Sequence, residues 1–240
     1  MNQLLKLCET RKLHYGKYLY KLVLANELNV LFRTEFQKDG KLSHARNQID
    51  QLSSQLRDGG PLTQAIFRTT REIHLNDFLD AKDIYSILKK SKDYKIRVDP
   101  YSSMTIYSND RAMLIKIANR MRTSARELWE PNADTLQLLS STRNVIVVDT
   151  LPLFPLKITF KNGKINNDFS RWLHANRDKS RIGDKALRNL EEYGYLDGFY
   201  MYVRDEKVLS LVTLLVGAHI RCVEKLIYKE DIDKYIYGSE

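Results

Sequence analysis

Cysteine, proline and glycine are all scarce in this chain, and no long apolar run interrupts it. The 240 residues include 2 cysteines, 5 prolines and 10 glycines. Cys8 and Cys222 are too few and too far apart for a disulfide framework or a zinc site. The longest apolar run, 208–216, is too short to cross a bilayer. These absences predict a soluble protein with no membrane partner, in a reducing, cytoplasmic compartment.

The signatures of common enzyme classes are also missing. The sequence has no Walker motif, no Gly-x-Gly-x-x-Gly and no Gly-x-Ser-x-Gly elbow. Its histidines occur singly, at positions 14, 44, 74, 174 and 219, without the spacing of metal ligands. We therefore expect no metal and no cofactor, and a non-catalytic protein is favoured over an enzyme.

One pair of residues is typical of metal-dependent nucleases. Asp149 ends an apolar segment, and Lys157 lies in the next one, so the two could stand on successive strands. The second carboxylate expected beside Lys157 is missing, because Pro155 and Leu156 occupy that place. A structural role at the end of a strand is favoured for Asp149, and a nuclease is the second alternative.

What the chain has in excess is positive charge. Its 39 lysines and arginines outnumber 30 aspartates and glutamates, which gives a net charge of +9 at pH 7. A charge of this sign favours an anionic partner such as nucleic acid. Hydrophobic residues make up 43% of the chain, an ordinary value for a folded protein, so we also expect a sizeable core.

Hydrophobic periodicity predicts an α+β fold with mixed, mostly antiparallel sheets and packed helices. The best-defined stretch is 94–126. Apolar and polar residues alternate over 94–98 and over 103–107, and 99–102 contains the proline of a turn. Helical spacing of apolar residues follows to about 121, and then a basic tail. This stretch predicts a hairpin and a helix.

A break at Glu130, Pro131 and Asn132 divides the chain into an N-terminal part, 1–130, and a C-terminal part, 131–240. The two parts are predicted to share a strand-hairpin-helix plan, but their sequence likeness is too weak to indicate duplication. They could also form one compact domain.

Three segments allow more specific predictions. Segment 17–24 is compatible with a strand or a helix. Segment 144–149 is apolar on both faces, which predicts a central strand. Segment 208–216 could be the buried helix of a βαβ crossover or a core strand of a long hairpin, and both alternatives stay open.

Two clusters of cations are candidate nucleic-acid-binding sites. The first lies on the hairpin, the helix and the tail of 94–126: Lys95, Arg97, Tyr107, Arg120, Arg122 and Arg126. The second surrounds a polar loop that precedes a helix: Arg171, Arg177, Lys179 and Arg181. Cations of this density can neutralise several phosphates, and tyrosine can stack on a base. A solvated helix face and an exposed loop are the plainer interpretations.

The sequence thus predicts a protein that binds single-stranded DNA or RNA through phosphates, with weak sequence preference. Single strands are favoured because no recognition helix stands out. The alternative is a virion structural, assembly or packaging protein. The composition, poor in glycine and rich in Tyr, Asn and Lys, is of the kind found in phage and viral proteins. Either interpretation allows a homo-oligomer or another protein partner. Both require that distant cations gather on one surface.

Overall fold

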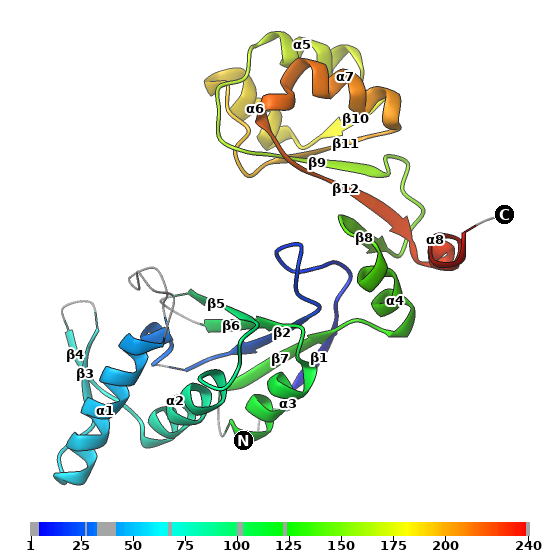
Figure 1. Ribbon diagram of the computed structural model, residues 1–240. Helices are drawn as coiled ribbons and strands as arrows, with labels where there is room; N and C mark the ends of the chain where they lie inside the picture. Colours follow the sequence, from blue (N-terminus) through cyan, green and yellow to red (C-terminus); the bar gives the residue numbers. More distant parts are fainter. Residues whose placement is uncertain are drawn as a thin grey trace. The chain divides into compact units, whose positions relative to one another are not determined.

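The predicted α+β fold is confirmed. The computed structural model describes residues 5–26, 28–32, 42–66, 69–99, 103–121 and 124–238. Within these ranges eight α-helices accompany two five-stranded sheets and one two-stranded sheet, and most strand pairs are antiparallel (Figure 1). None of the described helices has the length and apolar character needed to span a bilayer.

The chain divides into two compact units. The first comprises Met1–Thr10 and Lys17–Asn132, and the second comprises Arg11–Gly16 and Ala133–Glu240. Each unit has its own cluster of buried apolar residues, and the two clusters have no residue in common. The assignment of Arg11–Gly16 to the second unit is a feature that no pattern in the sequence indicates.

The first unit is built on one five-stranded sheet with the strand order β1-β7-β2-β6-β5. The helices α2 and α3 bury their apolar residues against one face of this sheet, and α1 packs against α2 and η1. The elements are β1 (Lys6–Glu9), β2 (Tyr20–Leu24), η1 (Asn29–Phe32), α1 (Ser43–Arg57), β3 (Thr63–Ile66), β4 (Thr69–Glu72), α2 (Leu75–Leu88), β5 (Tyr94–Asp99), β6 (Ser103–Ser108), α3 (Arg111–Arg120) and β7 (Ala125–Glu130).

The hairpin and helix predicted in 94–121 are present as β5, β6 and α3. Residues 100–102 of the predicted turn lie outside the described residues. The helix begins where the carboxylate of Asp110 accepts a 2.9 Å hydrogen bond from the N–H of Met113, an N-cap. Segment 17–24 contains a strand, β2. Of the predicted basic tail to Arg126, residues 122 and 123 lie outside the described residues, and Ala125 and Arg126 begin the strand β7, in which Leu128 packs in the core.

The second unit also has a five-stranded sheet, in the order β10-β11-β9-β12-β8. Its helices α5, α6 and α7 cover one face, with Phe160 and Met201 fully buried beneath them (Figure 1). The elements are α4 (Ala133–Ser141), β8 (Val145–Val148), β9 (Leu156–Phe160), α5 (Asp168–Ala175), β10 (Ser180–Ile182), α6 (Asp184–Tyr193), β11 (Tyr200–Val203), α7 (Glu206–Val216), η3 (Gly217–His219), β12 (Ile220–Tyr228), η4 (Lys229–Asp231) and α8 (Ile232–Tyr237).

The structure decides between the alternatives left open for the second unit. Segment 208–216 lies in the helix α7, which crosses from β11 to β12. The predicted polar loop after α5 contains a short edge strand, β10. The prediction that 144–149 is a central strand is wrong, because β8 lies at the other edge of the sheet. The N–H of Val147 there donates to the carbonyl of Arg11 at 2.8 Å, so the backbone of Arg11 pairs with this edge.

A tight turn after β9 depends on Gly163. Its φ of +154° is disfavoured for residues with a side chain, and a Cβ there would meet the ring of His219. We expect Gly163→Ala to lower the free energy of unfolding by about 1–3 kcal/mol, measured by urea denaturation. Adding His219→Ala should recover part of the loss, because it removes the clash but not the backbone strain. An unchanged urea midpoint in Gly163→Ala would contradict this account.

Candidate nucleic-acid interface

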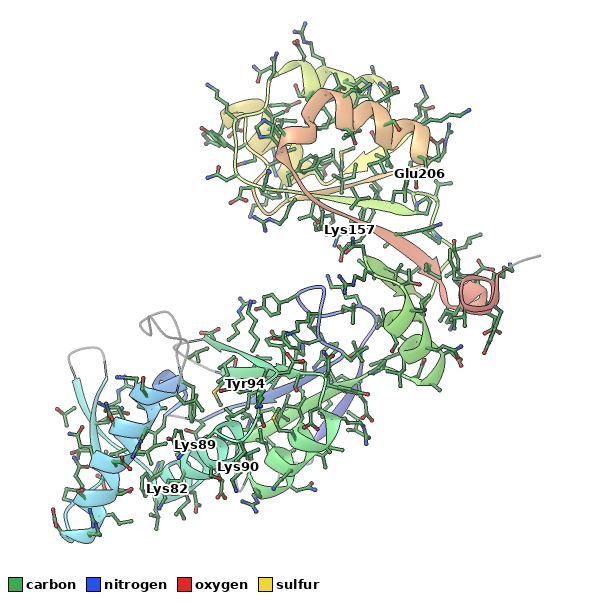
Figure 2. All side chains as sticks on the ribbon, in the orientation of Figure 1. Lys82, Lys89, Lys90, Tyr94, Lys157 and Glu206 are labelled. Atoms are coloured by element: carbon green, nitrogen blue, oxygen red, sulfur yellow. The ribbon has the colours of Figure 1, made fainter. Side chains whose placement is uncertain are left out.

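The face of the second sheet opposite α5, α6 and α7 carries a row of polar and aromatic side chains. Strand register aligns Arg181 on β10 with Tyr202 on β11, and Tyr202 with Lys157 on β9. Lys157 is aligned in turn with Glu224 on β12. Met201, beside Tyr202, is buried under the helices, and side chains alternate along a strand. The row therefore lies on the opposite face, where Figure 2 shows Lys157.

Two tyrosines give this face an aromatic surface. Tyr200, two residues before Tyr202 on the same strand, is 49% exposed. The two rings meet edge to face, with centroids 5.5 Å apart. The ammonium of Lys157 lies 5.0 Å from the centroid of the Tyr200 ring. Rings and cations are thus interleaved on one surface, which we call the tyrosine face: Arg181, Tyr200, Tyr202, Lys157 and Glu224.

The charges of the tyrosine face act on Tyr202. Burial is the main cause that raises the pKa of its hydroxyl above the ordinary value, and Tyr200 and Glu224 act in the same direction. Lys157 and Arg181, which the strand register places on either side of Tyr202, lower the pKa. The phenol of Tyr202 is therefore uncharged near neutral pH.

Glu224, on this face, interacts with two lysines. Its carboxylate accepts a 3.0 Å hydrogen bond from Lys157 and forms a 3.7 Å ion pair with Lys12. Lys12 belongs to Arg11–Gly16, which the second unit takes from the N-terminal part of the chain. Arg181, Lys157 and Lys12 together outnumber the one carboxylate, so the row keeps an excess of positive charge.

The structure does not bring Asp149 and Lys157 together. Asp149 follows β8, where it pairs with Arg11 and, at 3.9 Å, with Lys229. The strand β12 lies between β8 and β9. Val148 is aligned with Tyr228 of β12 and Lys157 with Glu224, so the two positions are four residues apart along β12. Four residues of strand span about 13 Å, so the two do not form a carboxylate-lysine pair. Within the described ranges, no group of three or more metal-ligating side chains is placed to hold an ion.

Of the other members of the second predicted cluster, Arg171 lies within α5, and Arg177 and Lys179 follow its end. Each bonds to a near neighbour in the chain: Arg171 to Asp168, Arg177 to His174 and Lys179 to Asn176. Arg177 and Arg181 line a hollow of about 240 Å³ at the start of α6. Of the four predicted residues, Arg181 is the one that joins the row of tyrosines.

The first predicted cluster is partly brought together on the first sheet. Lys95 is aligned with Tyr107, and Arg97 with Thr105, so these side chains share the face opposite α2 and α3, as predicted. Lys95 and Arg97 are exposed. Tyr107 is only 7% exposed, and its ring lies 6.5 Å from that of Tyr18. Its ring is therefore not available to stack on a base.

The remaining members of that cluster do not extend the same surface. Arg120 ends α3, on the side of the sheet that the helices cover, and pairs with Asp83 at 3.9 Å. Arg126 is half-buried at a bulge where β7 passes Leu24. Arg122 lies outside the described residues. The described cations of this cluster therefore divide between two faces of the unit.

Sequence reasoning missed Lys21 as a member of this surface. Lys21 is aligned with Tyr107, and its ammonium lies 3.6 Å from the ring centroid of Trp129. Burial lowers the pKa of Lys21, and the charges of Glu127 and Cys8 offset part of that effect. The alternation in 17–24 places Lys21 on the polar face of a strand, but the sequence does not indicate that this strand pairs with β6, and Trp129 fell in a segment not recognised as a strand. We call Lys21, Lys95, Arg97 and Tyr107 the basic face.

No protein-family model matches the chain, and comparisons with curated proteins and with solved structures give no significant match. The tyrosine face and the basic face are the features from which a function can be inferred.

Proposed function

We propose that the protein binds single-stranded nucleic acid on the tyrosine face, without catalysis. The observation that carries this proposal is the row of Arg181, Tyr202 and Lys157, with the exposed ring of Tyr200 beside it. Sheets with helices on one face and aromatic side chains on the other form a common platform for single-stranded RNA. Bases stack on the tyrosines, and Arg181, an exposed cation, contacts the phosphates between them.

Single strands fit this face better than a duplex does. A tyrosine ring can stack only on a base whose flat side is free, and a duplex hides those sides between neighbouring base pairs. Stacking and phosphate contact are available from every nucleotide, so the proposal includes weak sequence preference. RNA and single-stranded DNA offer the same two groups, and both belong in the binding test.

The salt dependence of binding tests the role of the cations. We expect the affinity for a labelled oligonucleotide, measured by fluorescence anisotropy, to fall as salt rises, with a log-log slope of about −0.7 for each phosphate contacted. Arg181→Gln should weaken binding and reduce the magnitude of the slope by about 0.7, because it removes one contact.

Lys185→Gln is the matched control for this measurement. Lys185 is an exposed cation on α6, and its loss changes the net charge by the same amount. We expect this variant to keep the slope of the unmodified protein. Equal slopes for Arg181→Gln and Lys185→Gln would mean that net charge, rather than the tyrosine face, governs binding. A lack of binding to both RNA and DNA at low salt would overturn the proposal.

A further inference from the structure

The two units have the same sheet topology. Read from the hairpin edge, the first sheet has the order β5-β6-β2-β7-β1, and the second has the order β10-β11-β9-β12-β8. In both sheets the first three neighbouring pairs are antiparallel, and the last pair is parallel. The corresponding strands also follow one another in the same order along the chain.

The helices correspond as well. A helix crosses from β6 to β7 over the central strand β2, and another crosses from β11 to β12 over the central strand β9. An aspartate N-cap precedes each crossover helix, Asp110 before α3 and Asp205 before α7. Each carboxylate accepts a 2.9 Å hydrogen bond from the N–H three residues later. Each unit therefore contains a split βαβ arrangement of the same design. The elements without a counterpart are η1, α1, β3 and β4 in the described part of the first unit, and α4, α6, η3, η4 and α8 in the second.

The side chains opposite the helices correspond at three aligned positions. In the second unit the row runs from Arg181 through Tyr202 to Lys157, on β10, β11 and β9. On the equivalent strands β5, β6 and β2 of the first unit, the aligned residues are Lys95, Tyr107 and Lys21. Both rows therefore read cation, tyrosine, lysine.

We propose that the chain is a tandem repeat of one folding unit, and that the basic face is a second site for the same single-stranded nucleic acid. This inference rests on the function proposed for the tyrosine face. Lys95 and Arg97 are exposed cations on this face, and the phosphates of a nucleic acid are complementary to them in charge.

The two sites differ in what they contact. Tyr107 is buried, and the ammonium of Lys21 lies over the ring of Trp129, so the basic face lacks an aromatic ring that a base can reach. Its contacts are those of Lys95 and Arg97 with phosphates, which add affinity without reading the bases. The basic face alone should therefore bind more weakly than the tyrosine face.

A chain with two such sites should respond to the length of its ligand. An oligonucleotide of about 8 nucleotides can occupy one face, whereas one of about 60 nucleotides can occupy both. Once the long ligand is bound to one face, its binding to the second face is an intramolecular step. A longer ligand binds more tightly simply because it offers more positions to one face. We expect a further gain in affinity, beyond this statistical effect, of at least about 10-fold. Anisotropy titrations over a series of lengths, with oligothymidine and oligouridine, measure this gain.

The double variant Lys95→Gln with Arg97→Gln identifies the face responsible. It should remove most of the length-dependent gain, whereas the Kd of the short oligonucleotide, which depends mainly on the tighter tyrosine face, should change much less. The matched control is Lys89→Gln with Lys90→Gln, at the end of α2 in the same unit, where Figure 2 labels both lysines. This control removes the same charge from exposed positions outside the basic face, and it should keep the gain.

The outcomes separate the two proposals. Absence of binding at every length overturns the function proposed for the tyrosine face, and the second site with it. Binding of the short oligonucleotide without a length-dependent gain overturns only the second site. The same conclusion follows if the two double variants lose the gain equally, because the loss would then depend on net charge alone.

Discussion

Replacing Tyr200 and Tyr202 together by alanine is expected to weaken binding of a single-stranded oligonucleotide by about 2–4 kcal/mol. Each ring can stack on one base, and the loss of a stacking ring costs about 1–3 kcal/mol. Two rings would therefore cost about 2–6 kcal/mol, and because Tyr202 is half-buried, the lower part of this range is expected. Anisotropy titrations at one fixed salt concentration measure the effect.

Two further substitutions show whether stacking is the cause. Replacing both tyrosines by phenylalanine keeps the rings and removes the hydroxyls, so affinity should change little. Tyr193→Ala removes a tyrosine that is 63% exposed but lies at the end of α6, off the tyrosine face, and should leave binding unchanged. If the phenylalanine variant binds as poorly as the alanine variant, the hydroxyls rather than the rings make the contact.

Phe160→Ala is expected to lower the free energy of unfolding of the second unit by about 3–5 kcal/mol. Phe160 is fully buried, and its ring meets that of Phe169 edge on, with centroids 6.2 Å apart. The two cores share no residue, so the first unit should keep its stability.

The two tryptophans report on the units separately, because Trp129 lies in the first and Trp172 in the second. Fluorescence-monitored urea unfolding of single-tryptophan variants measures each transition. Leu22→Ala is the reciprocal test, since Leu22 is fully buried in the first core. This substitution should lower the free energy of unfolding of the first unit by about 2–5 kcal/mol. If either substitution shifts both transitions by the same amount, the units unfold as one cooperative block.

Several features of the fold could be predicted because their causes are local. Alternation of period two is sufficient to identify β5 and β6, and an aspartate followed by helically spaced apolar residues identifies α3. Segment 208–216 was ambiguous because its many apolar, β-branched residues suit a buried strand as well as a buried helix. The N-cap of Asp205 and the packing of the apolar residues of α7 against the sheet favour the helix.

The candidate site was predicted less completely. Lys95 and Arg97 share a face, as expected from alternation within one strand. Tyr107 shares that face but is buried, because the exposure of a residue depends on the neighbouring strand and on Tyr18. The expected single positive surface was the weakest inference, since its residues come from elements whose pairing the sequence does not specify.

By itself, the sequence determined the positive charge, the α+β class and the side of each clear strand that is polar. These properties depend on residues close together in the chain. The tertiary structure alone decided that Arg181, Tyr202 and Lys157 form one row, and that a similar row crosses the first sheet. The physical reason is that alternation states which residues share a face of their own strand, whereas hydrogen bonding between strands distant in sequence decides which residues stand beside them.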